Sequence, residues 1–314
     1  MSPREQAMVP EAEFDSYYGR QIVKTPTWKT PDVPLYLFLG GLAGASAVLA
    51  EGAALTGRPE LERVARVAAA SGAAAGTVAL VHDLGRPERF LNMLRVFKPT
   101  SPLSVGSFIL APFGALSGAA AAAQVTGTFP RLGRLAGVGA AVLGPPLATY
   151  TAALLANTAV PAWHEAHREL PFVFAGSGAT AAGGVAMLFT PVDQAGPARR
   201  MTVAGAALEI VAAEALLNRL GMVAEPYREG RPGRLMGLAR TMTAAAAGAT
   251  VLAGRRSRTV SVLAGAACVT ASLLTRFGIF EAGIASAQDP KYTVVPQRER
   301  LRRRTGERTA SGAE

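Results

Sequence analysis

A series of long apolar runs, separated by short charged segments, limits the fold of this chain more than any other feature. Eight runs rich in Ala, Gly, Val and Leu each approach 20 residues, the length at which an α-helix crosses the hydrocarbon core of a bilayer. The pattern predicts an all-α integral membrane protein of eight transmembrane helices, arranged as two four-helix bundles with both termini on one side. We expect the spans at 33–55, 61–82, 103–126, 133–156, 171–190, 201–220, 235–254 and 259–280.

Polar segments flank this membrane domain. Residues 1–32 are expected to form an amphiphilic arm, residues 33–284 the membrane domain, and residues 285–314 a short, basic, extended tail. The arm has no apolar stretch of the signal-peptide type, so the first span is expected to act as its own insertion signal. Small residues four apart suit close helix packing in lipid, and occur at Gly40/Gly44, Gly72/Gly76, Gly114/Gly118 and Gly133/Gly137.

The charge is strongly positive, with a formal net value of +10. Nucleic acid is one possible partner for a basic protein, but here the arginines stand at the ends of apolar runs, where charges orient a membrane protein. We therefore expect membrane lipid and no nucleic acid. Lys and Arg are about twice as frequent on the side of the termini, which predicts cytoplasmic termini in a multi-pass cell-membrane protein. A basic face can also dock an acidic partner subunit.

The histidines and the cysteine argue against a resident metal centre. Cys268 is the one cysteine, and it cannot hold an iron–sulfur cluster or zinc alone. A membrane haem b needs paired axial histidines, whereas His82 stands at a span end and His164 and His167 share one loop. We predict no haem, no iron–sulfur cluster and no metal site in this chain. The His164–His167 segment, with Glu165, is interpreted as a solvated loop.

Ionisable residues inside spans are functional candidates because their burial in lipid is costly. The alternating direction of the spans places several polar groups in the half of the membrane near the termini. These are Tyr36, His82, Asp83, Tyr150, Glu214, Arg240 and Arg276. Two interpretations stay open: structural ion pairs such as Arg276–Glu214, or a polar pocket for a quinone ring, whose oxygens need hydrogen-bond donors and a proton path.

Two further carboxylates, Glu51 and Glu209, are expected deeper in the membrane or toward the far side. They are candidates for a proton relay together with Glu214. Alternatively each is neutral, or paired with an arginine, such as Arg58 for Glu51.

The segment His82-Asp83-Leu84-Gly85-Arg86-Pro87-Glu88-Arg89-Phe90 must lie where the chain leaves the hydrocarbon, because it is dense in charges. Gly85 and Pro87 stop helix propagation. It is either a polar turn between two membrane helices or a loop that positions charges beside a cofactor at the membrane surface.

Four stretches resemble a known family, and together they span nearly the whole chain. They are YYGRQIVKTPTWKTPDVPLYLFLGGLAGAS (17–46), HDLGRPERFLNMLRVFKPTSPLSVGSFIL (82–110), YTAALLANTAVPAW (150–163) and RFGIFEAGIASAQDPKYTVVPQRER (276–300). They resemble the NrfD/PsrC family, the polysulfide reductase membrane subunits. The stretch 82–110 is the most specific of the four.

The resemblance implies a quinol-linked membrane anchor of a molybdopterin oxidoreductase. Such a subunit exchanges electrons between a membrane quinone (menaquinone or ubiquinone) and a four-cluster iron–sulfur subunit, which connects to a molybdopterin catalytic subunit carrying the terminal substrate chemistry. By motif match, Tyr150, Asp83 and Arg276 correspond to family site residues. The start of the first span belongs to the family site too, and here it carries Tyr36. The partner is expected to dock over the 82–102 loop, through Arg86, Arg89, Arg95 and Lys98.

Within this reading, Tyr150 and His82 hydrogen-bond the ring oxygens, and Asp83 and Glu214 exchange protons. Arg276 stabilises negative charge on the quinone or orients Asp83. The alternative is a proton-translocating quinol-linked module, similar to Alternative Complex III membrane subunits, with Glu51 and Glu209 carrying protons. A secondary transporter is disfavoured, because Pro145-Pro146 interrupts the fourth span without a counterpart in the eighth.

Overall fold

The computed structural model describes residues 21–86 and 88–311, and every regular element in that part of the chain is helical. Eight helices are long and apolar enough to cross a membrane, as the apolar runs predict. They are α1 (Asp32–Leu55), α2 (Pro59–Asp83), α4 (Pro102–Thr126), α5 (Pro130–Ala156), α7 (Leu170–Phe189), α8 (Gly196–Arg219), α10 (Gly230–Ala253) and α11 (Arg258–Gln288). The all-α membrane architecture is therefore confirmed.

Short helices connect the spans and follow the last one. They are α3 (Glu88–Met93), α6 (Pro161–Glu165), η2 (Ala166–Arg168), η3 (Gly221–Ala224), α9 (Glu225–Arg228) and α12 (Lys291–Ser311). The prediction of an extended tail is wrong, because 291–311 is helix α12. Its segment 297–304 contains Gln, Arg, Glu and Leu, all favourable helix formers, so local propensity explains the difference.

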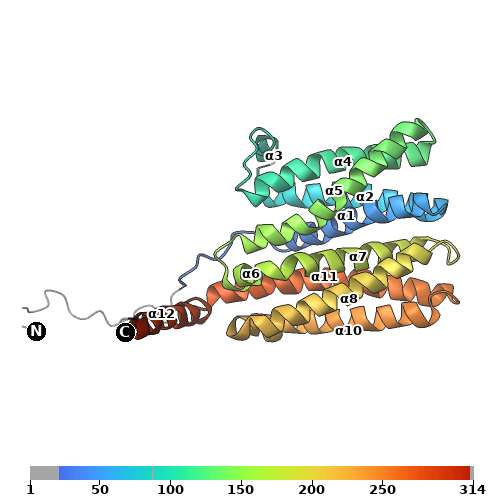
Figure 1. Cartoon of the computed structure of the whole chain (residues 1–314). Coiled ribbons are helices and arrows are strands. Elements are labelled where there is room, and N and C mark those ends of the chain that lie inside the picture. The colour runs from blue at the N-terminus through green and yellow to red at the C-terminus, as the bar shows by residue number, and fades with distance from the viewer. Residues whose placement is uncertain (1–20, 87, 312–314) are drawn as a thin grey trace, which may run out of the picture.

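The spans form two four-helix bundles side by side (Figure 1). One consists of α1, α2, α4 and α5, and the other of α7, α8, α10 and α11. Helix α1 joins them, because it also packs against α7 and α11. It is accordingly the most enclosed span. In its most apolar 18-residue stretch 83% of the residues are buried, against 22% in the corresponding stretch of α10 at the outer edge.

Glycines allow the closest helix contacts. A Cβ on Gly44 of α1 would overlap the carbonyl oxygen of Gly144 on α5, so this crossing tolerates no larger residue at either position. A Cβ on Gly178 of α7 would lie 2.9 Å from the carbonyl oxygen of Gly41, across the bundle boundary. Of the four predicted small-residue pairs, three contact neighbouring groups. The pair Gly114/Gly118 faces open space, so its prediction as a packing motif is wrong.

Helix α5 continues through Pro145-Pro146, although proline lacks a backbone N–H and usually breaks a helix. The two prolines leave the carbonyl oxygens of Ala141 and Val142 without their usual helical donors, and the hydroxyl of Thr149 donates to the carbonyl oxygen of Pro145 at 2.9 Å in the following turn. The helix therefore carries the following residue, Tyr150, inward into the bundle.

The two ends of the molecule differ (Figure 1). One end, which we call the arm end, gathers residues 21–31, α6, α9 and the start of α12. The opposite end, the turn end, holds the tight connections at 56–58, 127–129, 190–195 and 254–257. Residues 1–20 of the predicted arm lie outside the described part of the chain.

Candidate functional site

Two buried tyrosines face each other in the first bundle. Tyr36 lies in the second turn of α1 and Tyr150 near the end of α5, and their rings meet edge to face with centroids 6.4 Å apart. Glycines give both rings room: a Cβ on Gly106 of α4 would overlap the Tyr150 ring, and one on Gly76 of α2 would lie 3.7 Å from the Tyr36 ring. Four helices thus converge on this pair.

The hydroxyls of the pair make no hydrogen bond within residues 21–86 and 88–311. Neither the Tyr36 nor the Tyr150 hydroxyl hydrogen-bonds another described residue. By contrast, the Tyr227 hydroxyl donates to the carbonyl oxygen of Ala162 at 3.0 Å, and that of Tyr292 donates to Glu225 at 3.2 Å. Buried phenol groups normally find a partner. The pair therefore offers two donors, from opposing helices, to a molecule with oxygen acceptors.

A histidine–carboxylate pair lies between the tyrosines and water. His82 Nδ1 is 2.7 Å from Asp32 Oδ2, and the side chain of His82 is 72% exposed whereas that of Asp32 is 14% exposed. Asp32 and Tyr36 are four residues apart on α1, so they lie on the same face one turn apart. The pair can pass a proton between bulk water and the region of the tyrosines.

Asp83 has a different environment from the one predicted for it. Its Oδ1 accepts the backbone N–H of Lys29 at 2.8 Å, and the Lys29 ammonium donates to the carbonyl oxygen of His82 at 3.2 Å. The neighbouring Trp28 stacks on Trp163, with ring centroids 5.5 Å apart. Asp83 therefore fastens residues 28–29 over the arm end.

Arg276 lies in the second bundle, against α1. Its guanidinium group stacks on the Phe174 ring at 3.7 Å and donates from Nη2 to the Phe174 carbonyl oxygen at 2.9 Å. It also closely approaches Gly41. Nε and Nη1 are buried without a hydrogen-bond partner among the described residues. The hydrogen bond that orients Asp83 comes from Lys29, so the predicted role of Arg276 in orienting that carboxylate is not seen.

The structure does not contain the Arg276–Glu214 ion pair that was one of the two open interpretations. Glu214 of α8 pairs with Arg240 of α10 instead, and Glu281 pairs with Arg231 at 3.3 Å. The sequence could place these charges at similar depth but not on particular helix faces.

Glu209 is the most deeply buried carboxylate of the second bundle, with 5% of the residue exposed. Its Oε1 accepts the Thr275 hydroxyl at 2.7 Å, whereas its Oε2 has no partner among the described residues. Glu209 lines a cavity of about 350 Å³ between α8, α10 and α11, and Glu214 of α8 and Arg240 of α10 line it too. A buried carboxylate with a free oxygen beside a cavity can gain and lose a proton.

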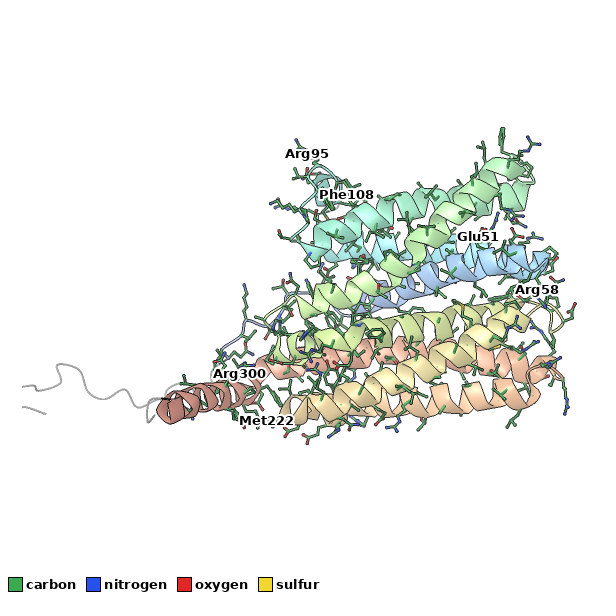
Figure 2. All side chains as sticks on the ribbon, in the orientation of Figure 1. Glu51, Arg58, Arg95, Phe108, Met222 and Arg300 are labelled. Carbon is green, nitrogen blue, oxygen red and sulfur yellow. The ribbon has the colours of Figure 1, made fainter. Side chains whose placement is uncertain are left out.

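Glu51 of the first bundle is held in an ion pair through its Oε1. Arg66 donates from Nη2 to Glu51 at 3.2 Å and to Glu62 at 2.8 Å. The partner considered in the sequence, Arg58, instead donates to the carbonyl oxygens of Asp193 and Gln194. Both Glu51 and Arg58 lie toward the turn end (Figure 2).

The loop between α2 and α4 carries the predicted docking cations. Arg86, Arg95 and Lys98 are exposed, and the side chain of Arg89 lies outside the described part of the chain. Arg95 lies at the end of the molecule opposite to Arg58 (Figure 2). The exposed cations are therefore at the arm end, on the same side of the membrane as His82.

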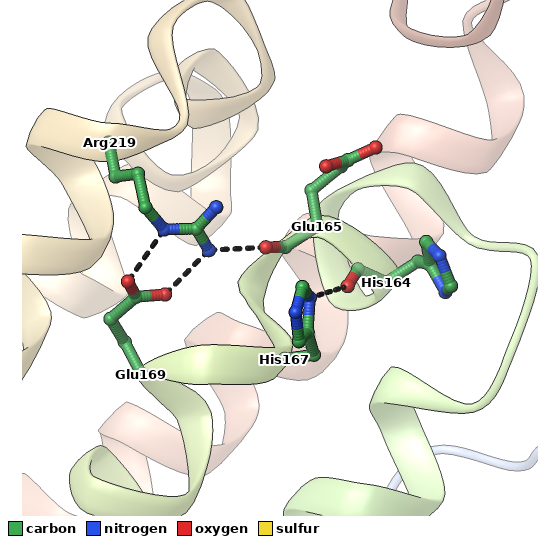
Figure 3. Close-up of polar contacts among 5 residues, drawn as sticks. All are labelled: His164, Glu165, His167, Glu169 and Arg219. Atoms are coloured by element: carbon green, nitrogen blue, oxygen red, sulfur yellow. Dashed lines mark hydrogen bonds and ion pairs between the residues drawn. The ribbon is translucent and has the colours of Figure 1, made fainter.

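The loop that holds the other two histidines is clamped onto α8 (Figure 3). Arg219 donates from Nε and Nη2 to the two oxygens of Glu169, both at 2.6 Å, and from Nη2 to the carbonyl oxygen of Glu165. These hydrogen bonds hold the pKa of Glu169 below its ordinary value. The His164 and His167 rings are exposed and donate to loop carbonyls, so this segment positions α6 and α7.

Several contributors to these sites were not identified from the sequence. Asp32, Arg66, Phe174 and Trp28 are the main ones. One signal was available for one of them: Asp32 and His82 are equidistant from the 56–58 turn. Residues equidistant from the turn of an antiparallel helix pair lie level with each other. The stacking of Phe174 on Arg276 carries no comparable sequence signal.

Comparison with known proteins gives one positive finding. The model of the family described as "Polysulphide reductase, NrfD" matches residues 23–206, more than half of the chain. A search of the curated proteins finds no match. The matched segment contains the tyrosine pair, the His82–Asp32 pair and the loop between α2 and α4.

Proposed function

We propose a function from one premise: the chain belongs to the polysulphide reductase NrfD family. Proteins of this family are membrane subunits that anchor oxidoreductase complexes, and the eight apolar helices make this chain a multi-pass membrane protein. Our proposal is that it exchanges electrons between a membrane quinone, menaquinone or ubiquinone, and a four-cluster iron–sulfur subunit docked at the arm end. A molybdopterin catalytic subunit beyond it would carry the terminal substrate chemistry.

The observation that carries the proposal is the pair of free hydroxyls on Tyr36 and Tyr150. A quinol has two ring oxygens and a flat apolar ring, which suit two opposed phenol groups in a lipid-embedded bundle. Tyr36 and Tyr150 would hold the ring oxygens by hydrogen bonds. The Tyr150 ring packs directly against Gly106, so its hydroxyl would be held in place before the quinone binds.

Quinol oxidation supplies two electrons and releases two protons, so the site needs a path to water. The His82–Asp32 pair is suited to this step because His82 is exposed and Asp32 lies one turn from Tyr36. His82 would accept a proton at its imidazole and release it to solution, and Asp32 would hold the ring in orientation. Asp32 thus takes the place that the sequence had suggested for Asp83.

The exposed cations of the α2–α4 loop suit an acidic partner surface. Arg86, Arg95 and Lys98 lie at the arm end, where the His82–Asp32 pair also lies. Complementary charge would steer and orient the iron–sulfur subunit over the quinone site. Docking here would keep the distance between the quinone and the first cluster short.

Replacing Tyr150 with phenylalanine tests the proposal. Tyr150→Phe keeps the ring over Gly106 and removes a hydroxyl that no described residue uses, so assembly should be unchanged. Quinol oxidation by the intact complex should fall at least about tenfold, which corresponds to one lost hydrogen bond at a reacting group. Tyr292→Phe, which removes a hydroxyl on α12, is the matched control. Normal turnover of Tyr150→Phe would show that the tyrosine assignment is wrong.

A second candidate function is proton translocation, and the cavity beside Glu209 favours it. A buried carboxylate that has one unpartnered oxygen and lines a cavity of about 350 Å³ could relay protons, with Glu214 toward the arm end. Complexes in sealed vesicles would then release more protons than quinol oxidation alone supplies. Glu209→Gln should abolish the excess, whereas an unchanged proton yield would exclude the relay. Glu51 is less suited to this role because Arg66 holds it in an ion pair.

A further inference from the structure

A basic pocket opens at the turn end between α8 and α10, on the opposite side of the membrane from the tyrosine pair. It has a volume of about 630 Å³, and four arginines line it: Arg58, Arg199, Arg200 and Arg255. They come from the α1–α2 turn, the first turn of α8 and the α10–α11 turn. Asp193 is the one carboxylate residue lining this pocket, so positive groups exceed negative ones by three.

The hydrogen bonds that these arginines make within the described part of the chain go to backbone carbonyl oxygens. Arg58 donates from Nη1 to the Asp193 carbonyl oxygen at 2.9 Å, and Arg199 donates from Nη1 to the Val192 carbonyl oxygen at 2.8 Å. These bonds fix the side chains but neutralise no charge, and Arg58 Nε is buried without a partner. In the described part of the chain, none of the four makes an ion pair. Like charges held this closely repel each other, and an anion would relieve the repulsion.

Below the arginines the wall of the pocket is apolar. Val203, Ala204 and Ala207 of α8 face Val251 of α10. These two helices are also the least buried of the eight spans, so the groove between them is open to the hydrocarbon. The polarity therefore changes along the groove from cationic at the membrane surface to apolar toward its centre. A small inorganic anion would contact the arginines alone, whereas a phospholipid would contact both the arginines and the apolar wall.

We propose that this pocket binds an anionic phospholipid. Its phosphodiester group would lie among Arg58, Arg199, Arg200 and Arg255, whose planar guanidinium groups match phosphate oxygens. Its acyl chains would follow the groove between α8 and α10. A zwitterionic headgroup fits less well, because its own cation would face four guanidinium groups.

Lipid binding by the full-length chain in detergent tests this proposal. Native mass spectrometry would measure retention of added phosphatidylglycerol, with phosphatidylcholine as the zwitterionic comparison and inorganic phosphate as competitor. We expect phosphatidylglycerol to bind at least about tenfold more tightly than phosphatidylcholine, since the interaction is electrostatic. Millimolar inorganic phosphate should leave the lipid bound. Equal binding of the two lipids, or displacement by phosphate alone, would overturn the assignment to a lipid.

The sharper test substitutes Arg200 and Arg255, the two arginines of the pocket that make no hydrogen bond to a described residue. Arg200→Gln with Arg255→Gln should weaken phosphatidylglycerol binding about 25-fold, or about fivefold for each cation. An unchanged lipid-free unfolding temperature would show that the fold is intact. The control is Arg131→Gln with Arg134→Gln, which removes the same charge from the turn end of the other bundle. Equal weakening in both double variants, or none in the first, would contradict a specific pocket.

Discussion

Each bundle contains a buried glutamate on a membrane-spanning helix, and the two are held differently. Glu51 in the first bundle shares Arg66 with Glu62, at 3.2 and 2.8 Å. Glu209 in the second accepts one hydroxyl, from Thr275, its other oxygen has no partner among the described residues, and the residue lines a cavity. A carboxylate held in an ion pair stabilises one structure, whereas a partly satisfied one is better suited to exchange a proton. This difference is the basis for our proposal of a structural role for Glu51 and a proton relay for Glu209.

The same contrast holds for the two bundles as a whole. The first has close glycine contacts around α1 and contains two tyrosine hydroxyls that hydrogen-bond no described residue. The second has its two least buried helices side by side, with one cavity at the arm end and another at the turn end. We infer that the first bundle positions a ligand rigidly, whereas the α8–α10 boundary of the second admits water or lipid.

The largest expected effect comes from replacing Arg66, which forms ion pairs with Glu51 and Glu62 in the first bundle. Arg66→Met leaves Glu51 and Glu62 without their shared cation, and unpaired buried charges cost about 3–5 kcal/mol of unfolding free energy. Denaturant unfolding in detergent would measure the loss. Adding Glu51→Gln and Glu62→Gln should recover most of it, because no charge is then left unpaired. A loss below about 1 kcal/mol would show that the group is not structural.

The next largest effect is expected from widening the close crossing of α1 and α5. Gly44→Ala places a methyl group against the backbone of Gly144, and overpacking of this kind costs about 1–3 kcal/mol. Gly118→Ala is the matched control, since a Cβ there meets open space. Thermal unfolding of both variants in the same detergent gives the comparison. Equal stability of the two variants would contradict the close α1–α5 crossing.

A direct comparison of the two glutamates has an intermediate effect. Glu51→Gln should lower the unfolding free energy by about 2 kcal/mol, because it removes a charge-assisted hydrogen bond. Glu209→Gln should cost less than about 1 kcal/mol, since the amide oxygen can still accept from Thr275. If Glu209→Gln destabilises as much as Glu51→Gln, the contrast between the bundles fails.

The smallest expected effect concerns the Arg219 clamp at the arm end. The pKa of Glu169 is lowered by its hydrogen bonds with Arg219, so the clamp is fully formed above the ordinary glutamate pKa of about 4.3. Its contribution, less than about 1 kcal/mol for an ion pair near the surface, is lost as the pH falls below that value. The wild type should unfold at a higher temperature than Glu169→Gln at pH 7, and the difference should narrow toward pH 3. A difference that is constant with pH would contradict the clamp.

The spans could be predicted from the sequence because bilayer thickness fixes the length of an apolar helix. Alternating direction also placed Tyr36, Tyr150 and His82 in one half of the membrane. The orientation of each helix about its own axis could not be predicted, and it decides the partners. For this reason the sequence offers Arg58 and Glu214 only as candidate partners of Glu51 and Arg276. In the structure Glu51 pairs with Arg66, and Arg276 stacks on the Phe174 ring. The tail differed because local helix propensity, which hydropathy does not measure, sets the structure of α12.

The most direct test of the account is the location of the quinone. An azido-quinone, activated by light in the intact complex and mapped by peptide mass spectrometry, reports which bundle holds the ring. We predict labels on α1 and α5 around Tyr36 and Tyr150, and their loss when excess native quinol competes. Labels on α8 and α10 around the Glu209 cavity, also removed by competing quinol, would place the quinone in the second bundle and contradict the account.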